Sequence, residues 1–169
     1  MPDLLSELVS RQEPYIALAE RYHRKSHFLY MGRGPNHPIA LEGALKLKEI
    51  AYTHAEGCSA GEMKHGPIAL VDEGMPVVAI APQDGLRDKM INSIFEVKAR
   101  GATVIAVATE GDEELAGIAD HVLYIPPVSP LLTPVLSSVP LQLLAYHIAV
   151  KRGCEIDQPR NLAKSVTVE

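Results

Sequence analysis

Short runs of apolar, mostly β-branched residues recur along this chain of 169 residues, and helical segments lie between them. A strand that is apolar throughout, without alternation, is covered on both faces, as the strands of parallel sheets are. The alternation of such strands with helices predicts a three-layer α/β/α sandwich with a mainly parallel sheet of about five strands. Four apolar runs are predicted as strands, residues 28–31, 77–80, 103–107 and 121–125, and residues 53–58 are a candidate for a short fifth strand.

Proline and glycine mark the ends of the predicted helices. Pro38 suits a first helical turn, and Gly101 and Gly153 are typical of the position just after a helix. Pro134 and Pro140 should make the first turns of the last helix irregular. The predicted helices are residues 38–52, 84–100, 113–119 and 130–152.

The length suits one domain with a sizeable core, flanked by two shorter parts. Residues 1–25 are predicted to form a helical arm that is broken near Pro14. Residues 26–152 should form the sandwich, and residues 153–169 a C-terminal tail.

The charge and the cysteines exclude several classes of function. A net charge of -5 provides no basic surface for nucleic acid and argues against binding to a membrane surface. No apolar run is long enough, by this reading, to span a bilayer. Cys58 and Cys154 lack the spacing of a metal or redox motif, so we expect free thiols in a reducing compartment, the cytoplasm.

The predicted helix over residues 38–52 carries a polar stripe. Glu42, Lys46 and Glu49 are spaced i, i+4 and i+7, so they point from one face of the helix. From the residues alone, a solvated face with Glu–Lys pairs is the favoured interpretation. The alternative is the wall of a cleft, where two carboxylates and an ammonium could move protons on a substrate.

Three longer segments resemble one enzyme family. Residues 39–49, 59–67 and 157–169, in this order, are similar to motifs of the glucosamine-6-phosphate synthase family, the glutamine–fructose-6-phosphate aminotransferases. The resemblance covers about residues 28–169. It implies that the chain is the second of two tandem sugar isomerase (SIS) domains, each a flavodoxin-like sandwich. The first SIS domain and the glutaminase domain of the family have no counterpart in this sequence.

The resemblance also assigns roles to individual residues. The family makes glucosamine 6-phosphate from fructose 6-phosphate and glutamine-derived ammonia, and Lys164 corresponds to the lysine that forms a Schiff base with the sugar ketone. Glu49 corresponds to the base that moves the proton between C1 and C2. The resemblance therefore favours the wall of a cleft over a solvated face for the helical stripe. Lys46 and Glu42 correspond to active-site residues that assist proton transfer and hold the charge of the site. Ala163 is expected to contact the substrate.

His65 corresponds to the family's histidine that opens the sugar ring and reaches into the site of the neighbouring subunit, so a homodimer is expected. Histidine suits this task because it exchanges protons near neutral pH. The lysine imine and the acid–base residues suffice in principle without a cofactor. No metal is expected either, since Glu62 and His65 have no third ligand.

The loop from Gly32 to His37 follows the first predicted strand and leads into the next helix. Its two glycines would allow a tight turn, and a helix N-terminus favours an anion. The family holds the sugar phosphate on a loop rich in Ser and Thr in its first SIS domain, and this loop has no hydroxyl side chain. We therefore expect a plain turn here, and little synthase activity from the chain alone.

Three other functions stay open at this point. Related SIS proteins include deglycases and sugar-phosphate isomerases. SIS domains also serve as regulatory modules that bind sugar phosphates, and such a module needs no imine-forming lysine. The apolar segment over residues 130–152 could also serve dimerisation alone.

Overall fold

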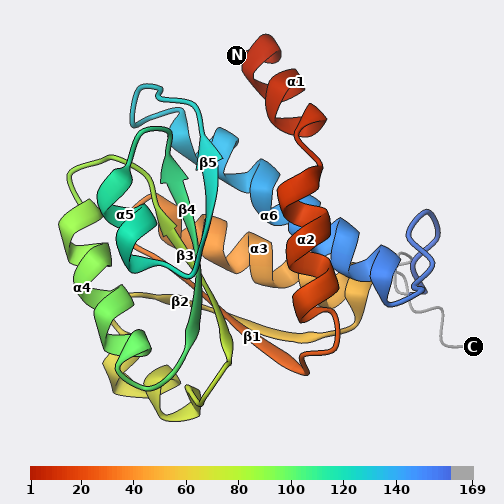
Figure 1. Ribbon diagram of the computed structural model, residues 1–169, viewed down its shortest axis with the longest axis horizontal. Helices are drawn as coiled ribbons and strands as arrows, with labels where there is room; N and C mark the ends of the chain where they lie inside the picture. Colours follow the sequence, from red (N-terminus) through yellow and green to blue (C-terminus); the bar gives the residue numbers. More distant parts are fainter. Residues whose placement is uncertain (161–169) are drawn as a thin grey trace, which may run out of the picture.

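Five parallel strands form one sheet in the order β2-β1-β3-β4-β5, with helices on both faces. The computed structural model describes residues 1–160 and confirms the predicted α/β/α sandwich (Figure 1). All five predicted strands are present. Their bounds are β1 (His27–Gly32), β2 (His54–Ser59), β3 (Pro76–Ala81), β4 (Thr103–Thr109) and β5 (His121–Ile125).

The helices between the strands give each parallel connection its crossover. Two short 3-10 helices, η1 (Met63–His65) and η2 (Pro67–Leu70), follow β2. The α-helices are α1 (Pro2–Ser10), α2 (Glu13–Tyr22), α3 (Asn36–Ala51), α4 (Arg87–Lys98), α5 (Glu113–Ile118) and α6 (Thr133–Lys151).

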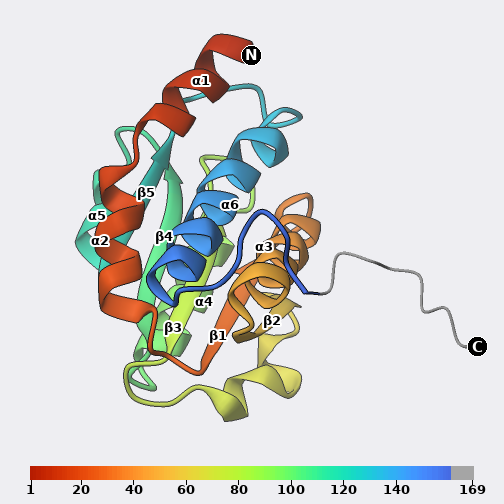
Figure 2. The same ribbon diagram turned by 90° about the vertical axis from the view of Figure 1, so that its right-hand side faces the viewer.

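Alternate residues of each strand enter two separate cores. Tyr30 and Val78 belong to the core beneath α1, α2, α3 and α6. Leu29 and Val77 belong to the core beneath α4 and α5 on the other face. All four are at most 2% exposed. Complete burial of such a side chain contributes about 1.5–3 kcal/mol, so the apolar strands hold both helical layers on the sheet. Figure 2 shows α6 and α3 together on one side of the sheet.

Three helices differ from the predicted bounds at their starts. α3 begins two residues before Pro38, which lies in its first turn. α4 begins at Arg87 because Asp84 Oδ1 accepts the Leu86 N–H at 2.8 Å and holds a turn before the helix. α6 begins at Thr133, whose Oγ1 donates to the Pro130 carbonyl at 2.7 Å. The predicted break in the N-terminal arm lies between α1 and α2, and Pro14 is in the first turn of α2.

α6 corrects one expectation from the sequence. By length and composition alone it could cross a membrane, whereas no segment was expected to meet those criteria. Its most apolar window is 56% buried inside the protein, with α2 and α3 packed against the helix. A helix of a protein core passes the same test, so this finding is weak evidence for a membrane span.

Candidate active site

The polar stripe of α3 is a cluster of three charged side chains. α3 starts beside the C-terminal end of β1 and returns along the sheet to the start of β2. Lys46 Nζ lies 2.7 Å from Glu49 Oε2 and 3.5 Å from Glu42 Oε1. The three side chains keep 32–40% of their surface exposed. The sequence prediction that the three residues share one face of the helix is therefore confirmed. We call this set the α3 cluster.

The electrostatics of the α3 cluster keep Lys46 protonated. The hydrogen bond to Glu49 raises the pKa of Lys46 above its usual value, and the charge of Glu42 raises it further, while partial burial opposes both. An ammonium can donate hydrogen bonds and protons, but it cannot attack a carbonyl carbon. The cluster thus offers carboxylates and a cation for proton transfer, and it needs a nucleophile from elsewhere.

His65 lies far from the α3 cluster within one chain. It ends η1, just after the C-terminal end of β2, whereas Glu49 precedes the start of β2. The six residues of β2 lie between them, and an extended strand of that length spans about 20 Å. The His65 side chain is 75% exposed, and its Nε2 lies 4.0 Å from a carboxylate oxygen of Glu62. The structure therefore does not bring His65 together with the cluster inside a single subunit.

Lys164 and Ala163 lie outside the described residues, so their roles stay predictions. The described start of the tail runs from Gly153 to Arg160. Arg160 contacts Tyr52, the residue that follows α3, through a hydrogen bond and through its guanidinium, which lies over the ring. Sequence reasoning missed this contact because it joins positions that are 108 residues apart.

The backbone of the loop from Gly32 to His37 requires its two glycines. A side chain at Gly32 would come within 2.1 Å of the Asn36 carbonyl oxygen, and Gly34 has a φ of 51°. Asn36 Nδ2 donates to Asp84 Oδ2 at 3.0 Å, which ties the loop after β1 to the loop after β3. These contacts account for the glycines without a ligand and favour the plain turn expected from the sequence.

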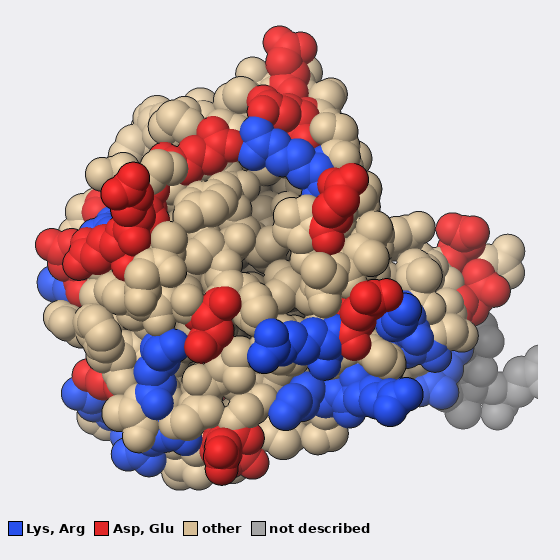
Figure 3. Space-filling model, viewed as in Figure 1, with Lys and Arg blue, Asp and Glu red and all other residues tan. Residues whose placement is uncertain are grey.

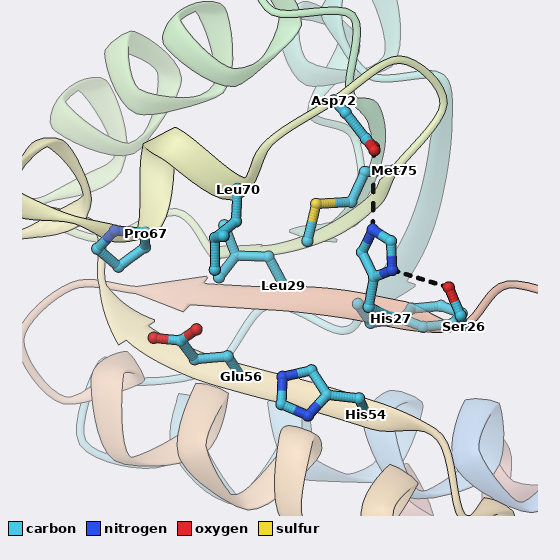
Figure 4. Close-up of a pocket in the computed structure, with 10 residues that line it drawn as sticks. Ser26, His27, Leu29, His54, Glu56, Pro67, Leu70, Asp72 and Met75 are labelled. Carbon is cyan, nitrogen blue, oxygen red and sulfur yellow. Dashed lines mark hydrogen bonds and ion pairs between the residues drawn. The ribbon is translucent and has the colours of Figure 1, made fainter.

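A pocket of about 420 Å³ lies on the opposite face of the sheet from α3. It is lined by the first residues of β1 and β2 and by the segment around η2 (Figure 4). Ser26 Oγ lies 2.8 Å from His27 Nδ1, and His27 Nε2 lies 3.9 Å from Asp72 Oδ1. This order resembles a Ser–His–Asp triad, but 3.9 Å is too long for a hydrogen bond. Among residues 1–160, none of the candidate catalytic residues lines this pocket.

Basic side chains gather at the end of the molecule where α2 and α6 terminate (Figure 3). Lys151 pairs with Glu20 at 2.9 Å, and Arg152 donates to the His23 carbonyl at 2.7 Å. Cations near a helix C-terminus are favoured by the helix dipole, so these residues have a role in ending the helices. Among residues 1–160, no group of three His, Cys, Asp or Glu side chains could hold a metal ion.

Comparison with known sequences finds close relatives. Residues 21–152 match the model of the SIS domain family. The chain is 57% identical over its full length to the glutamine–fructose-6-phosphate aminotransferase (isomerizing) of Thermus thermophilus, and 54% identical to that of Aquifex aeolicus. It covers 28% of each of these proteins, so it spans less than a third of their length.

Comparison with solved structures finds a member of the same aminotransferase family. The C-terminal domain of glucosamine–fructose-6-phosphate aminotransferase from Francisella tularensis has a TM-score of 0.87 and 41% identity, over 92% of this chain and 44% of that one. The tagatose-6-phosphate ketose/aldose isomerase of Escherichia coli has a TM-score of 0.77 and 22% identity, over 92% of this chain and 44% of that one. At that identity the second likeness concerns the fold alone.

Proposed function

The chain belongs to the SIS domain family, and from that premise we propose that it acts as the second sugar isomerase domain of a glutamine–fructose-6-phosphate aminotransferase. The complete enzyme would make glucosamine 6-phosphate from fructose 6-phosphate and glutamine-derived ammonia. The α3 cluster carries the proposal, because two carboxylates and an ammonium on one exposed helical face suit proton transfer on a bound sugar. The match to aminotransferases along the whole chain supports it.

The proposed reaction begins with Lys164. Its free amine attacks the C2 ketone of the open sugar, and loss of one water leaves an imine. Ammonia then replaces the lysine at C2, which releases the amine. A proton then moves from C1 to C2, and the O1 hydroxyl loses its proton as the imine nitrogen gains one, so that this ketimine becomes the amino aldose. Each step conserves atoms and electrons and requires no oxidant.

Glu49 is the proposed carrier of the proton between C1 and C2. Lys46 donates to Glu49 at 2.7 Å, which holds this carboxylate in place and balances its charge. Glu42 lies 3.5 Å from Lys46 and would restrain the ammonium from the other side. A sugar bound over this face would cover side chains that keep about one-third of their surface exposed.

Borohydride reduction tests the proposal. The complete aminotransferase is incubated with fructose 6-phosphate and borohydride, and the adduct is mapped by mass spectrometry. We expect the label on Lys164 and its loss in Lys164→Arg, whose guanidinium forms no imine. A sugar-phosphate-binding regulatory module would bind fructose 6-phosphate and form no adduct. A label on Lys46 or Lys64 instead would contradict the assignment of Lys164.

A homodimer is the second part of the proposal. His65 is 75% exposed and about the length of β2 away from the cluster, so a partner subunit is the simplest way to bring both to one sugar. One inactive His65→Ala chain is mixed with one inactive Lys164→Ala chain of the complete enzyme. Subunit exchange should restore one intact site per mixed dimer. If activity stays absent after exchange is verified, the two residues act within one chain.

The reducing cytoplasm is the compartment we propose. Cys58 and Cys154 are free thiols. Burial raises the pKa of Cys58 to about 11, so this thiol stays protonated and unreactive near neutral pH.

A further inference from the structure

The turn that carries His65 has a glycine near each end. Gly61 lies two residues before η1, and Gly66 follows η1 directly. Glycine leaves the backbone free to rotate at both points. The His65 ring adds little restraint, because its Nε2 lies 4.0 Å from a carboxylate oxygen of Glu62, which is beyond hydrogen-bonding distance. Contacts of the neighbouring residues must therefore set the direction in which His65 projects.

The base of the turn is packed in the core beneath α4 and α5. Met63, the first residue of η1, belongs to this core and is 0% exposed. The Ala60 N–H donates to the Gly32 carbonyl at 2.9 Å, which ties the approach to the turn to the end of β1. These contacts fix one side of the turn, and His65 lies two residues beyond Met63.

An ion pair with α4 attaches the turn beside His65 itself. Lys64 Nζ lies 2.7 Å from Glu96 Oε1. The Glu96 side chain is 30% exposed and that of Lys64 is 62% exposed, so the carboxylate is the better fixed of the two. Because Lys64 directly precedes His65, this pair restrains the backbone at the histidine.

α4 also contacts the chain before and after the turn. Ser93, one turn before Glu96, is 1% exposed, and its Oγ lies 3.4 Å from the Ala60 carbonyl oxygen. Arg100, two residues beyond the end of α4, donates to the Ile68 carbonyl at 3.4 Å. Figure 1 shows this segment, in yellow, beside the end of α4. Both distances are longer than that of the ion pair, which lies between the two contacts and is therefore the main polar link.

We propose that Glu96 is a positioning residue for His65. Through its pair with Lys64 it holds the η1 turn against α4, and this sets where His65 reaches in the site of the neighbouring subunit. The catalytic role of His65 in this statement rests on the proposed function, whereas the attachment of the turn does not. A displacement of about 1 Å at a reacting group can slow a reaction by up to about 10²-fold, so even an exposed ion pair can matter at this place.

A charge exchange tests the pair. Glu96→Lys and Lys64→Glu each place two like charges side by side, which should push the turn away from α4. The chain with both substitutions has one charge of each sign again and should recover. Glu96→Gln removes the attraction without adding repulsion. Lys89→Glu is the matched control, since Lys89 is exposed on α4 and has no ion pair within residues 1–160.

The first measurement is NMR relaxation on this chain. Backbone order parameters of residues 63–65 should fall from about 0.85 towards 0.6 in Glu96→Lys and return in the exchanged pair. The melting temperature should change little in every variant, because exposed pairs contribute little stability.

The second measurement is turnover of the complete aminotransferase. At saturating fructose 6-phosphate, kcat should fall about tenfold in Glu96→Lys and about threefold in Glu96→Gln, with a much smaller change in KM. The exchanged pair should recover most of the loss. In a chain that already carries His65→Ala, Glu96→Lys should cause no further loss of the residual turnover, because no imidazole remains to be positioned.

The outcomes are distinct. Unchanged order parameters in Glu96→Lys would show that the pair does not hold the turn. Lower order parameters with unchanged kcat, or an equal further loss in the His65→Ala chain, would show that Glu96 does not act through His65, which overturns the proposal as well. If His65→Ala alone is fully active, the proposed role of His65 fails and with it the positioning role, and the order parameters still decide whether Glu96 holds the turn.

Discussion

Two clusters in this protein each centre on one basic side chain with acidic partners, and they differ in how they are built. The α3 cluster lies within one helix, and each of its members is about one-third exposed. The other joins α4 to α5. There Arg87 donates to both oxygens of Asp112 at 2.6 Å and to Glu114 at 2.9 Å.

Burial separates the two clusters further. The side chain of Asp112 is 4% exposed and that of Arg87 is 14% exposed. Asp112 also accepts the Leu115 N–H at 3.0 Å, which caps the start of α5. A buried, two-pronged pair that joins two elements has its hydrogen-bonding groups engaged in holding the fold. An exposed pair within one helix contributes little stability, so its residues can serve a substrate instead.

The largest expected difference between the two clusters is the effect of Glu49→Gln on activity. The amide keeps the shape of the side chain and cannot take up the proton. Loss of a general base typically slows turnover by roughly 10²–10⁴-fold. The substitution is made in the complete aminotransferase, and kcat and KM for fructose 6-phosphate are measured beside the melting temperature. Near-normal turnover would assign the proton to another group.

Asp112→Asn should have the largest effect on stability. It removes the buried carboxylate that pairs with Arg87 and leaves the exposed Glu114 and Asp88 beside the guanidinium, while asparagine can still cap α5. Breaking a buried pair of this kind costs about 3 kcal/mol. Urea unfolding of the chain measures the change. Arg87→Lys is the control, since it keeps the charge and loses the two-pronged geometry. If Asp112→Asn costs no more than Glu42→Gln, burial does not distinguish the clusters.

The pH dependence of stability should differ in sign between the clusters. The hydrogen bond from Arg87 lowers the pKa of Asp112 below its ordinary 3.8, so its contribution is present above that pH and is lost as pH falls through the folded value. The raised pKa of Lys46 gives a contribution that is present below about 10.5 and is lost as pH rises through the folded value. Unfolding is followed from pH 2 to 11. Asp112→Asn should reduce the pH dependence of the free energy of unfolding at acidic pH and leave it unchanged at alkaline pH.

Lys46→Met should produce the smallest change in stability. The pairs with Glu42 and Glu49 are exposed, and such pairs contribute about 0.3–0.5 kcal/mol each. Methionine keeps the apolar stem and the helix propensity. Urea unfolding should therefore shift by less than about 1 kcal/mol. A loss as large as that of Asp112→Asn would mean that the α3 cluster also supports the fold.

The sequence predicted the sheet well because its signal is local. A strand that is buried on both faces must be apolar at every position, as β3 is. The α3 cluster was predictable for the same reason, since spacing along one helix sets which side chains share a face. The starts of α4 and α6 were less predictable, because hydrogen bonds by Asp84 and Thr133 hold turns before them.

The contacts of Tyr52 had no local signal. A left-handed tyrosine follows no propensity, and its partner Arg160 lies 108 residues away. The separation of His65 from Glu49 required knowing that α3 returns to the start of β2. The boundaries at residues 25 and 152 stay predictions, as do the roles of Lys164 and Ala163.

The order of the strands also determines how fast this domain can fold. β1 lies inside the sheet between β2 and β3, and its pairing with β3 encloses all of α3, β2, η1 and η2. The entropy of closing that loop is lost before the pairing contributes any stability, so parallel sheets of this kind fold slowly. Until β3 arrives, one side of β1 presents open backbone groups, and another unfinished chain can pair there. The slow pairing of β1 with β3 is therefore the step at which this domain is most open to aggregation and would benefit most from a chaperone.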